Sequence, residues 1–177
     1  MLQFLMKLPT FIETMKPELR YGLIIGLGVS LWVLVEFLLG FHTKYMDIGE
    51  FTGYLSVIIP ILSLYSGLFA KRMENLSITY WQLVKAGMMM VVLGALIISL
   101  FMGLYNTVIH PEWVEEGIAF ERQRLVDMNA TTEEIAAAEE VMAVVFSAEM
   151  QMIISFIGVV FEGFFLTLLI AWFVQKK

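Results

Sequence analysis

The stretch TGYLSVIIPILSLYSGLFA, residues 52–70, decides the fold of this chain. It is apolar and long enough to cross a hydrocarbon core of about 30 Å as a helix. Its small residues recur at alternating steps of three and four and therefore share one stripe: Gly53, Ser56, Pro60, Ser63, Gly67 and Ala70. Small residues allow close contact between helices in lipid, so we expect neighbouring helices to contact this stripe along its whole length. Pro60 removes a backbone hydrogen bond and predicts a mild kink.

Composition places the rest of the chain in the same class. The sequence has 177 residues, of which 59% are hydrophobic, and a mean hydropathy of +0.81. Four apolar runs reach membrane-spanning length: residues 19–39, 52–70, 81–105 and 150–174. We predict an all-α integral membrane protein with a single four-helix transmembrane domain over residues 17–177. Residues 1–16, apolar with Lys7 and Lys16, predict a short interfacial segment that is retained.

Charge sets the expected orientation. Eight basic residues fall on one side of a four-span arrangement: Lys7, Lys16, Arg20, Lys71, Arg72, Lys85, Lys176 and Lys177. Lys44, Arg122 and Arg124 fall on the other side. Because basic residues are enriched in cytoplasmic loops, we expect both termini in the cytoplasm. The net charge of −6 also argues against nucleic acid as a partner.

The segment 106–149 is the one sizeable part predicted outside the membrane. It holds ten carboxylates against Arg122 and Arg124. Pro111 favours a helix start, Asn129 suits a left-handed stop, and Thr131 with Glu134 forms a capping box that starts a second helix. We therefore expect an acidic extracytoplasmic helical hairpin whose second arm runs without a break into the fourth span.

Small residues also mark packing faces on other spans. Gly22, Gly26 and Ser30 follow at steps of four in the first span and are the expected mate for the 52–70 stripe. Ser155 and Gly158 mark one face of the fourth span. The third span holds several small residues that do not line up on one face, so the sequence does not predict which face of this span packs.

Two carboxylates lie within apolar spans. Glu36 is near the end of the first span and close to its small face, whereas Glu162 is close to the middle of the fourth. Carboxylates in lipid are costly and normally face protein or a wet cavity. Three interpretations remain open: neutral carboxyls that hydrogen-bond as structural glue, a proton or cation relay, and pairing with a charge on a partner.

Chemical motifs are otherwise scarce. His42 and His110, with Asp47 or Glu112, could in principle bind a metal, but their spacing matches no known ligand motif. With no Cys there is no thiol nucleophile or thiolate ligand. No nucleophile with a base and no phosphate-binding loop is evident. We therefore predict no catalytic, cofactor-binding or metal-binding residues, and expect a protein that is not an enzyme.

Several segments resemble the bacterial family named domain of unknown function 4199. They are the run YGLIIG at residues 21–26, the run ending in Ile109, His110, Pro111 and Glu112, the Glu-rich arm around residues 131–140, and the closing apolar segment 163–177. The resemblance covers residues 17–177. It implies a small four-helix protein of the bacterial inner membrane and no particular activity. The chain departs from the family pattern before Pro17 and at Asn129, where similar proteins often have Gly.

Two functional hypotheses follow. In the first, the protein is a non-catalytic subunit or accessory protein that associates with itself or another membrane protein through small-residue faces, in contact with membrane lipids. Its acidic hairpin, residues 112–149, would contact a periplasmic partner or cations. In the second, it is a small transporter or channel that uses Glu36 and Glu162.

Overall fold

The computed structural model describes residues 15–176, and it is helical with no strand in that part. Residues 1–14 of the predicted interfacial segment lie outside the described residues. The elements in chain order are α2 (Pro17–Leu38), α3 (Met46–Gly53), the 3-10 turn η1 (Tyr54–Val57), α4 (Ile58–Glu74), α5 (Tyr80–Leu104), the π-helical turn η2 (Tyr105–Ile109), α6 (Trp113–Asp127), α7 (Thr132–Val145) and α8 (Ala148–Lys176).

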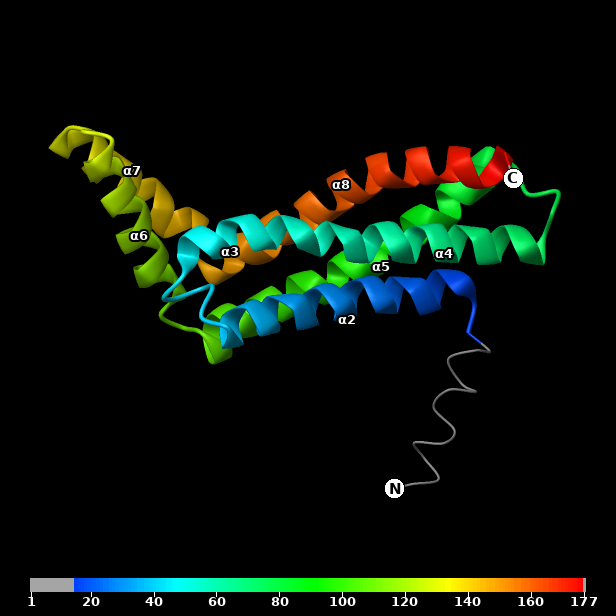
Figure 1. Ribbon diagram of the computed structural model, residues 1–177, viewed down its shortest axis with the longest axis horizontal. Coiled ribbons are helices and arrows are strands. Elements are labelled where there is room, and N and C mark those ends of the chain that lie inside the picture. The colour runs from blue at the N-terminus through cyan, green and yellow to red at the C-terminus, as the bar shows by residue number, and fades with distance from the viewer. Residues whose placement is uncertain (1–14, 177) are drawn as a thin grey trace, which may run out of the picture.

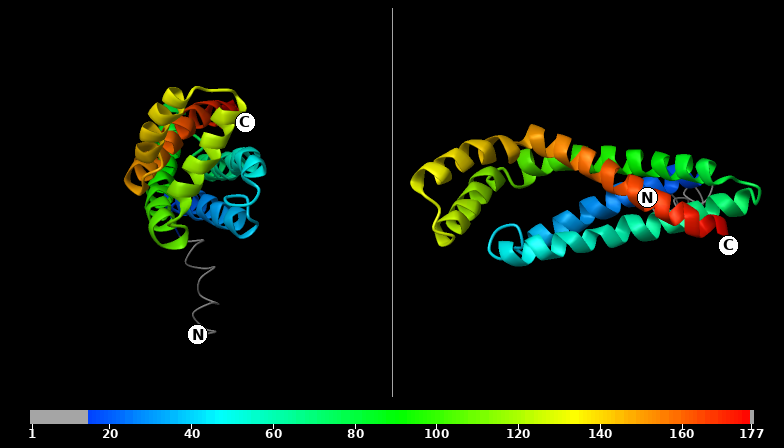
Figure 2. Two further views of the ribbon diagram at one scale, coloured as in Figure 1. Left: turned by 90° about the vertical axis from the view of Figure 1, so that its left-hand side faces the viewer. Right: turned by 90° about the horizontal axis from the view of Figure 1, so that it is seen from above.

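Four helical stretches are long and apolar enough to cross a membrane, as the sequence predicted. They are Pro17–Leu38, Met46–Glu74, Tyr80–Ile109 and Ala148–Lys176. The four run side by side along the long axis of the molecule, with α6 and α7 projecting together beyond one end (Figures 1 and 2). The start of α2, the end of α4 and the end of α8 lie at the opposite end (Figure 1). This is the architecture of a multi-pass membrane protein.

The third span, α5, is the central helix of the bundle. A Cβ atom added at Gly94 would lie 2.6 Å from Ile25 of α2, and one added at Gly87 would lie 2.5 Å from Thr167 of α8. Its glycines therefore serve two neighbours on different sides. This explains why the sequence of this span shows no single small-residue stripe.

The prediction that the small face of α2 packs on the 52–70 stripe is wrong. Gly22 and Gly26 face α5 instead: an added Cβ would lie 2.9 Å from Leu93 and 2.6 Å from Ile97, respectively. Ser30 is buried and donates its hydroxyl to the Gly26 carbonyl at 2.8 Å. The large side chains of Leu93 and Ile97 on α5 fill the space that the two glycines leave, which a second row of small residues could not do.

The 52–70 stripe is not contacted at its first residue. Ser63 and Gly67 are buried, and Gly67 lies against Met90 of α5 and Tyr21 of α2. Gly53, by contrast, has open space around it, since an added Cβ would meet nothing within 4 Å. The expectation of contact along the whole stripe is therefore wrong at Gly53.

The predicted irregularity near Pro60 occurs one turn before it. The helix tightens to the 3-10 turn Tyr54–Val57, and the Ser56 hydroxyl donates to the Gly53 carbonyl at 2.7 Å. Proline lacks the N–H that would bond the Ser56 carbonyl, so the preceding turn has no reason to keep α geometry.

The hairpin of α6 and α7 follows the predicted start and stop signals. Asn129 has φ of 60°, the left-handed conformation expected there. The Thr131 hydroxyl accepts a hydrogen bond from the Glu134 N–H, and the Glu134 carboxylate accepts one from the Thr131 N–H, which completes the capping box. Helix α6 begins at Trp113, two residues after Pro111, which lies in the preceding turn.

The prediction of an unbroken helix from α7 into α8 is wrong. Helix α7 ends at Val145, and Ser147 accepts a hydrogen bond from the Met150 N–H at 3.3 Å, which caps the start of α8. The break lets Phe146 turn toward Trp113 and Gly117 of α6. Burying an aromatic ring between the hairpin arms offsets the loss of helical hydrogen bonds at this point.

Candidate functional site

The end of α2 turns back on itself beside a buried carboxylate. Gly40 has φ of +77°, in the region that favours glycine. The Phe41 N–H donates to the Glu36 carbonyl at 2.9 Å, and the Gly40 N–H donates to the Phe37 carbonyl at 2.9 Å, a Schellman motif. The chain after this turn carries His42 back over the Glu36 side chain.

The π-helical turn at the end of α5 supplies the next two groups. Its wider turn lets the His110 N–H donate to the Tyr105 carbonyl, five residues earlier, at 2.8 Å. Tyr105 and His110 are thereby brought to the same side of the turn. Such turns recur at functional sites because they redirect side chains within an otherwise regular helix.

Five side chains then form a continuous polar chain, which we term the polar relay: Glu36, His42, Tyr105, His110 and Glu116. His42 Nε2 lies 3.6 Å from Glu36 Oε2, and His42 Nδ1 lies 2.6 Å from the Tyr105 hydroxyl oxygen. That oxygen lies 3.1 Å from His110 Nδ1. His110 Nε2 lies 3.0 Å from Glu116 Oε2. The relay joins the end of α2 to the first turns of α6.

Most of the polar relay is removed from solvent. Glu36 and His110 are each 3% exposed, and Tyr105 is 1% exposed. The Phe37 ring lies 5.7 Å from the Tyr105 ring and 4.9 Å from the His110 ring. In such apolar surroundings a hydrogen bond is stronger than in water, and an unpaired polar group is more costly.

Burial affects the protonation of His42. Burial lowers the pKa of His42, and the nearby His110 lowers it further, although the carboxylate of Glu36 raises it in part. The net direction is downward, so His42 favours the neutral form.

Four buried polar atoms in this region have no partner among residues 15–176. They are Glu36 Oε1, both amide atoms of Asn106, which directly follows Tyr105, and the indole Nε1 of Trp113. Asn106 is 5% exposed. Buried polar atoms in proteins are nearly always hydrogen-bonded, so these unpaired atoms are a costly feature of the region.

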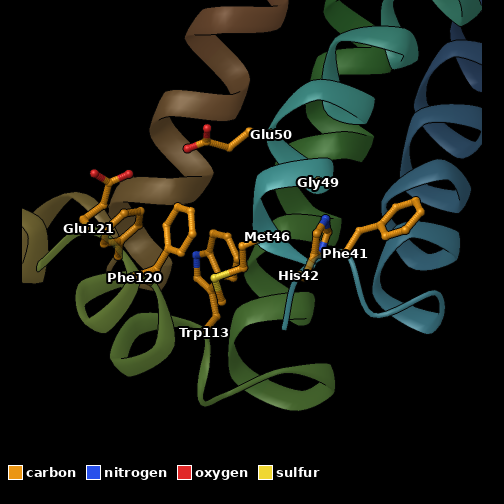
Figure 3. Close-up of a pocket in the computed structure, with 10 residues that line it drawn as sticks. Phe41, His42, Met46, Gly49, Glu50, Trp113, Phe120 and Glu121 are labelled. Carbon is orange, nitrogen blue, oxygen red and sulfur yellow. The ribbon is translucent and has the colours of Figure 1, made fainter. Parts of the chain in front are cut away.

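A pocket of mixed character adjoins the relay. Its walls are the aromatic and apolar side chains of Phe41, Met46, Trp113, Phe120 and Phe146, together with His42, Gly49, Gly117 and the carboxylates Glu50 and Glu121. Figure 3 shows Trp113 and Phe120 of α6 facing Met46, with His42 on one side and the two carboxylates on another. Arg124 donates to both Glu50 and Glu121 at 2.9 Å, which ties α6 to α3 at the rim.

The two predicted intramembrane carboxylates lie in different places. Glu36 faces the protein interior, as its position on α2 predicted, and belongs to the polar relay. Glu162 is exposed on α8. It lines a separate pocket together with Ser56 and Pro60, and Glu36 does not line that pocket. The structure does not bring the two carboxylates together.

The two histidines lie on either side of one hydroxyl group. His42 and His110 converge on the Tyr105 hydroxyl and not on Asp47 or Glu112. Within the part of the chain that the structure describes, no group of three His, Cys, Asp or Glu side chains is placed to hold a metal ion. Sequence reasoning missed Tyr105 and Glu116, because a π-helical turn has no recognisable sequence pattern.

Gly158, on the predicted packing face of the fourth span, is not contacted by any other part of residues 15–176. An added Cβ at Gly158 would meet nothing within 4 Å, and Ser155 donates only to the Met152 carbonyl of its own helix. The face of α8 that packs on α5 instead holds Gly163 and the buried Thr167. A Cβ atom added at Gly163 would lie 2.5 Å from Val91 of α5.

Taken together, the bundle of four apolar helices and the polar relay at its hairpin end define an all-helical, multi-pass membrane protein. Residues 20–176 match the family model described as Protein of unknown function (DUF4199). The chain belongs to this family, which confirms the resemblance seen in its sequence. No curated protein and no solved structure matches the chain significantly.

Proposed function

We propose that this protein is a non-catalytic accessory protein of the bacterial inner membrane that associates with itself or another membrane protein through α8. The observation that carries the proposal is the surface formed by the exposed Gly158 and Glu162 with the half-buried Ser155 beside them, which we term the α8 face. Gly158 has open space around it, and Glu162 is exposed. A small residue invites a close helix contact, and a carboxylate in lipid favours a partner that supplies a hydrogen bond or a charge.

The neighbouring groove extends the α8 face toward α4. Ser56 and Pro60 line the same pocket as Glu162, and Gly53 lies open one turn before Ser56. A partner helix laid against α8 would therefore meet small residues on two helices.

We place both termini in the cytoplasm and the hairpin on the periplasmic side. The basic end of the bundle supports this orientation: Lys71 lies 2.7 Å from Glu18 and lines one pocket with Lys85. Basic residues prefer the cytoplasmic side. The opposite end carries the acidic hairpin, in which Glu112, Glu115, Glu133 and Glu140 are not paired with a cation among residues 15–176. These carboxylates are available to a basic partner or to cations.

Purification in mild detergent followed by crosslinking tests the association. We expect higher-mass species from the native sequence, and a loss of most of them in Gly158→Leu, because the larger side chain blocks close approach of a partner. Ile153→Phe is the matched control, since Ile153 is also exposed and lies about 140° around the helix from Gly158. A native protein that stays a monodisperse monomer with no partner would contradict the proposal.

The transporter hypothesis has one supporting observation, the pocket that Glu162 lines within the span region. The separation of Glu36 from that pocket weighs against it. A proton or cation flux assay in proteoliposomes on the native protein and Glu162→Gln separates the two hypotheses. Flux that is absent from the native protein, or unchanged by the substitution, removes the transporter.

A further inference from the structure

The hydrogen-bond partners in the polar relay determine how many protons its two imidazoles carry together. His42 Nε2 and His110 Nε2 each face a carboxylate oxygen, of Glu36 and Glu116 respectively. The separation is 3.0 Å for His110 and a looser 3.6 Å for His42. Because an N–H can point at a carboxylate oxygen and a nitrogen lone pair is repelled by one, this geometry favours a proton on each Nε2.

The remaining two nitrogens share one hydroxyl group. His42 Nδ1 and His110 Nδ1 both lie within hydrogen-bonding distance of the Tyr105 oxygen, at 2.6 and 3.1 Å. The hydroxyl has one proton and donates it to one Nδ1, so the other Nδ1 must itself donate to the oxygen. The two rings thus hold three N–H groups between them, which makes one ring neutral and the other an imidazolium.

We propose that Glu36, His42, Tyr105, His110 and Glu116 form one proton-binding site, in which a single proton is shared between the two imidazoles across the Tyr105 hydroxyl and ties α6 to the membrane-spanning helices. The proton can pass from one imidazole to the other while the Tyr105 side chain stays neutral. When His42 Nδ1–H is donated to the Tyr105 oxygen, the original hydroxyl proton passes to His110 Nδ1, and the imidazolium moves from one ring to the other.

Release of this proton weakens the base of the hairpin. It leaves through Glu116, whose side chain is 39% exposed, to hydroxide or water outside. Two imidazole N–H groups then remain for three acceptors, which are the two carboxylates and the Tyr105 oxygen. One hydrogen bond of the relay is therefore lost, and two lone pairs face each other in its place. Helix α6 has few other contacts with the membrane-spanning helices, chiefly the Arg124 pair with Glu50 and the packing of Trp113 near His42. The other ionisable groups at this base are Glu121 and Glu50, both already bound by Arg124.

Nitrogen-15 NMR of histidine-labelled full-length protein in lipid nanodiscs tests the shared proton. Between about pH 5 and 9, where imidazoles titrate, we expect a single step that removes one proton and changes both rings together. Tyr105→Phe keeps the aromatic ring and should split this into two independent steps. Tyr54→Phe, at an exposed tyrosine outside the relay, should leave it unchanged. Independent titration in the native protein, or two rings that stay neutral throughout, would overturn the proposal.

A second variant covers the case in which Tyr105→Phe does not fold. Glu36→Gln replaces a carboxylate by an amide that can either donate or accept, so the count no longer requires an imidazolium. We expect the one-proton step to disappear in this variant. Its persistence at the native midpoint would overturn the proton count.

Spin labels test the mechanical role of the proton. Nitroxides are placed at exposed positions on the hairpin and on α3 by Met128→Cys and Ile48→Cys, in a chain that has no other cysteine. We expect a narrow distance distribution below the titration step and a broad one above it. Glu116→Gln should give the broad distribution at both pH values, and Glu115→Gln, its exposed neighbour, should behave as the native sequence. A distribution that stays narrow through the step would overturn the link to α6.

Discussion

His42 and His110 lie far apart in the sequence, and one hydroxyl group brings them together. Each ring has its Nδ1 directed at Tyr105 and its Nε2 at a carboxylate. Two backbone features make this arrangement: the left-handed Gly40 after α2 and the π-helical turn after α5. The chemistry of the site therefore depends on where two helices end, and less on which residues form their apolar faces.

The lowered pKa of His42 predicts how stability depends on pH. The unfolded chain binds a proton at this ring near its ordinary pKa of 6.5, whereas in the folded protein His42 takes a proton of its own, in addition to the one shared with His110, only at lower pH. The unfolded state thus holds more protons as the pH falls below about 6.5, and the free energy of unfolding contributed by this ring decreases. Thermal unfolding followed by circular dichroism at pH 7.5 and pH 5.5 measures the effect.

His42→Gln is the control for this pH dependence. The amide cannot titrate, so the variant should lose less stability than the native protein on acidification. An equal loss in both proteins would show that another group is responsible.

Gly26→Ala and Gly158→Ala should have opposite effects on stability. A methyl group at position 26 would lie 2.6 Å from Ile97 and force α2 away from α5, at a cost of about 1 to 3 kcal/mol. Position 158 has open space, so alanine there should stabilise the helix by up to about 1 kcal/mol. Thermal unfolding of detergent-solubilised protein compares the two, and a similar loss for both would contradict the packing described above.

Helix α5 packs closely against more of the bundle than any of the other three spans. It packs on α2 through Gly94 and on α8 through Gly87, and its core includes Leu83, Met90 and Val91. A helix with neighbours on several sides needs small residues on more than one face. A single stripe, such as that of residues 52–70, belongs to a helix whose contacts with its neighbours are less extensive.

The hairpin depends on one residue that takes the left-handed conformation. Asn129 has φ of 60°, and the Ala130 N–H closes the end of α6 on the Leu125 carbonyl at 3.0 Å. Asn129→Ala should destabilise the hairpin by about 1 kcal/mol, because a Cβ-bearing residue without a polar side chain disfavours this conformation. Asn129→Gly should be neutral or stabilising.

Hydrogen exchange of backbone amides in α6 and α7 measures this effect. We expect faster exchange in Asn129→Ala and unchanged or slower exchange in Asn129→Gly, with the amides of α5 unaffected. Equal exchange in the two variants would show that the turn does not limit the stability of the hairpin.

The molecule as a whole has two chemically different ends. One end gathers Lys71 and Lys85 near Glu18. The other end carries the hairpin of α6 and α7 (Figure 1), with the polar relay at its base. In a membrane, these ends would face different compartments.

Single cysteines test the orientation of the two ends without background, because the chain has none. We expect a reagent that cannot cross the membrane to label Thr43→Cys and Glu134→Cys from the periplasmic side and to spare Glu74→Cys. Labelling of all three after the membrane is opened is the control for access. The reverse pattern would place the hairpin in the cytoplasm.

The sequence by itself determined the number of spans, the hairpin between the third and fourth, and the signals at Asn129 and Thr131. These features depend on local hydrophobicity and on backbone preferences within a few residues. Three features depend on how the helices pack: Gly22 and Gly26 face α5, Gly158 remains uncovered, and His42 meets His110 through Tyr105. Small residues permit close contact without specifying the partner, and side chains from separate helices meet only where the packed backbones carry them.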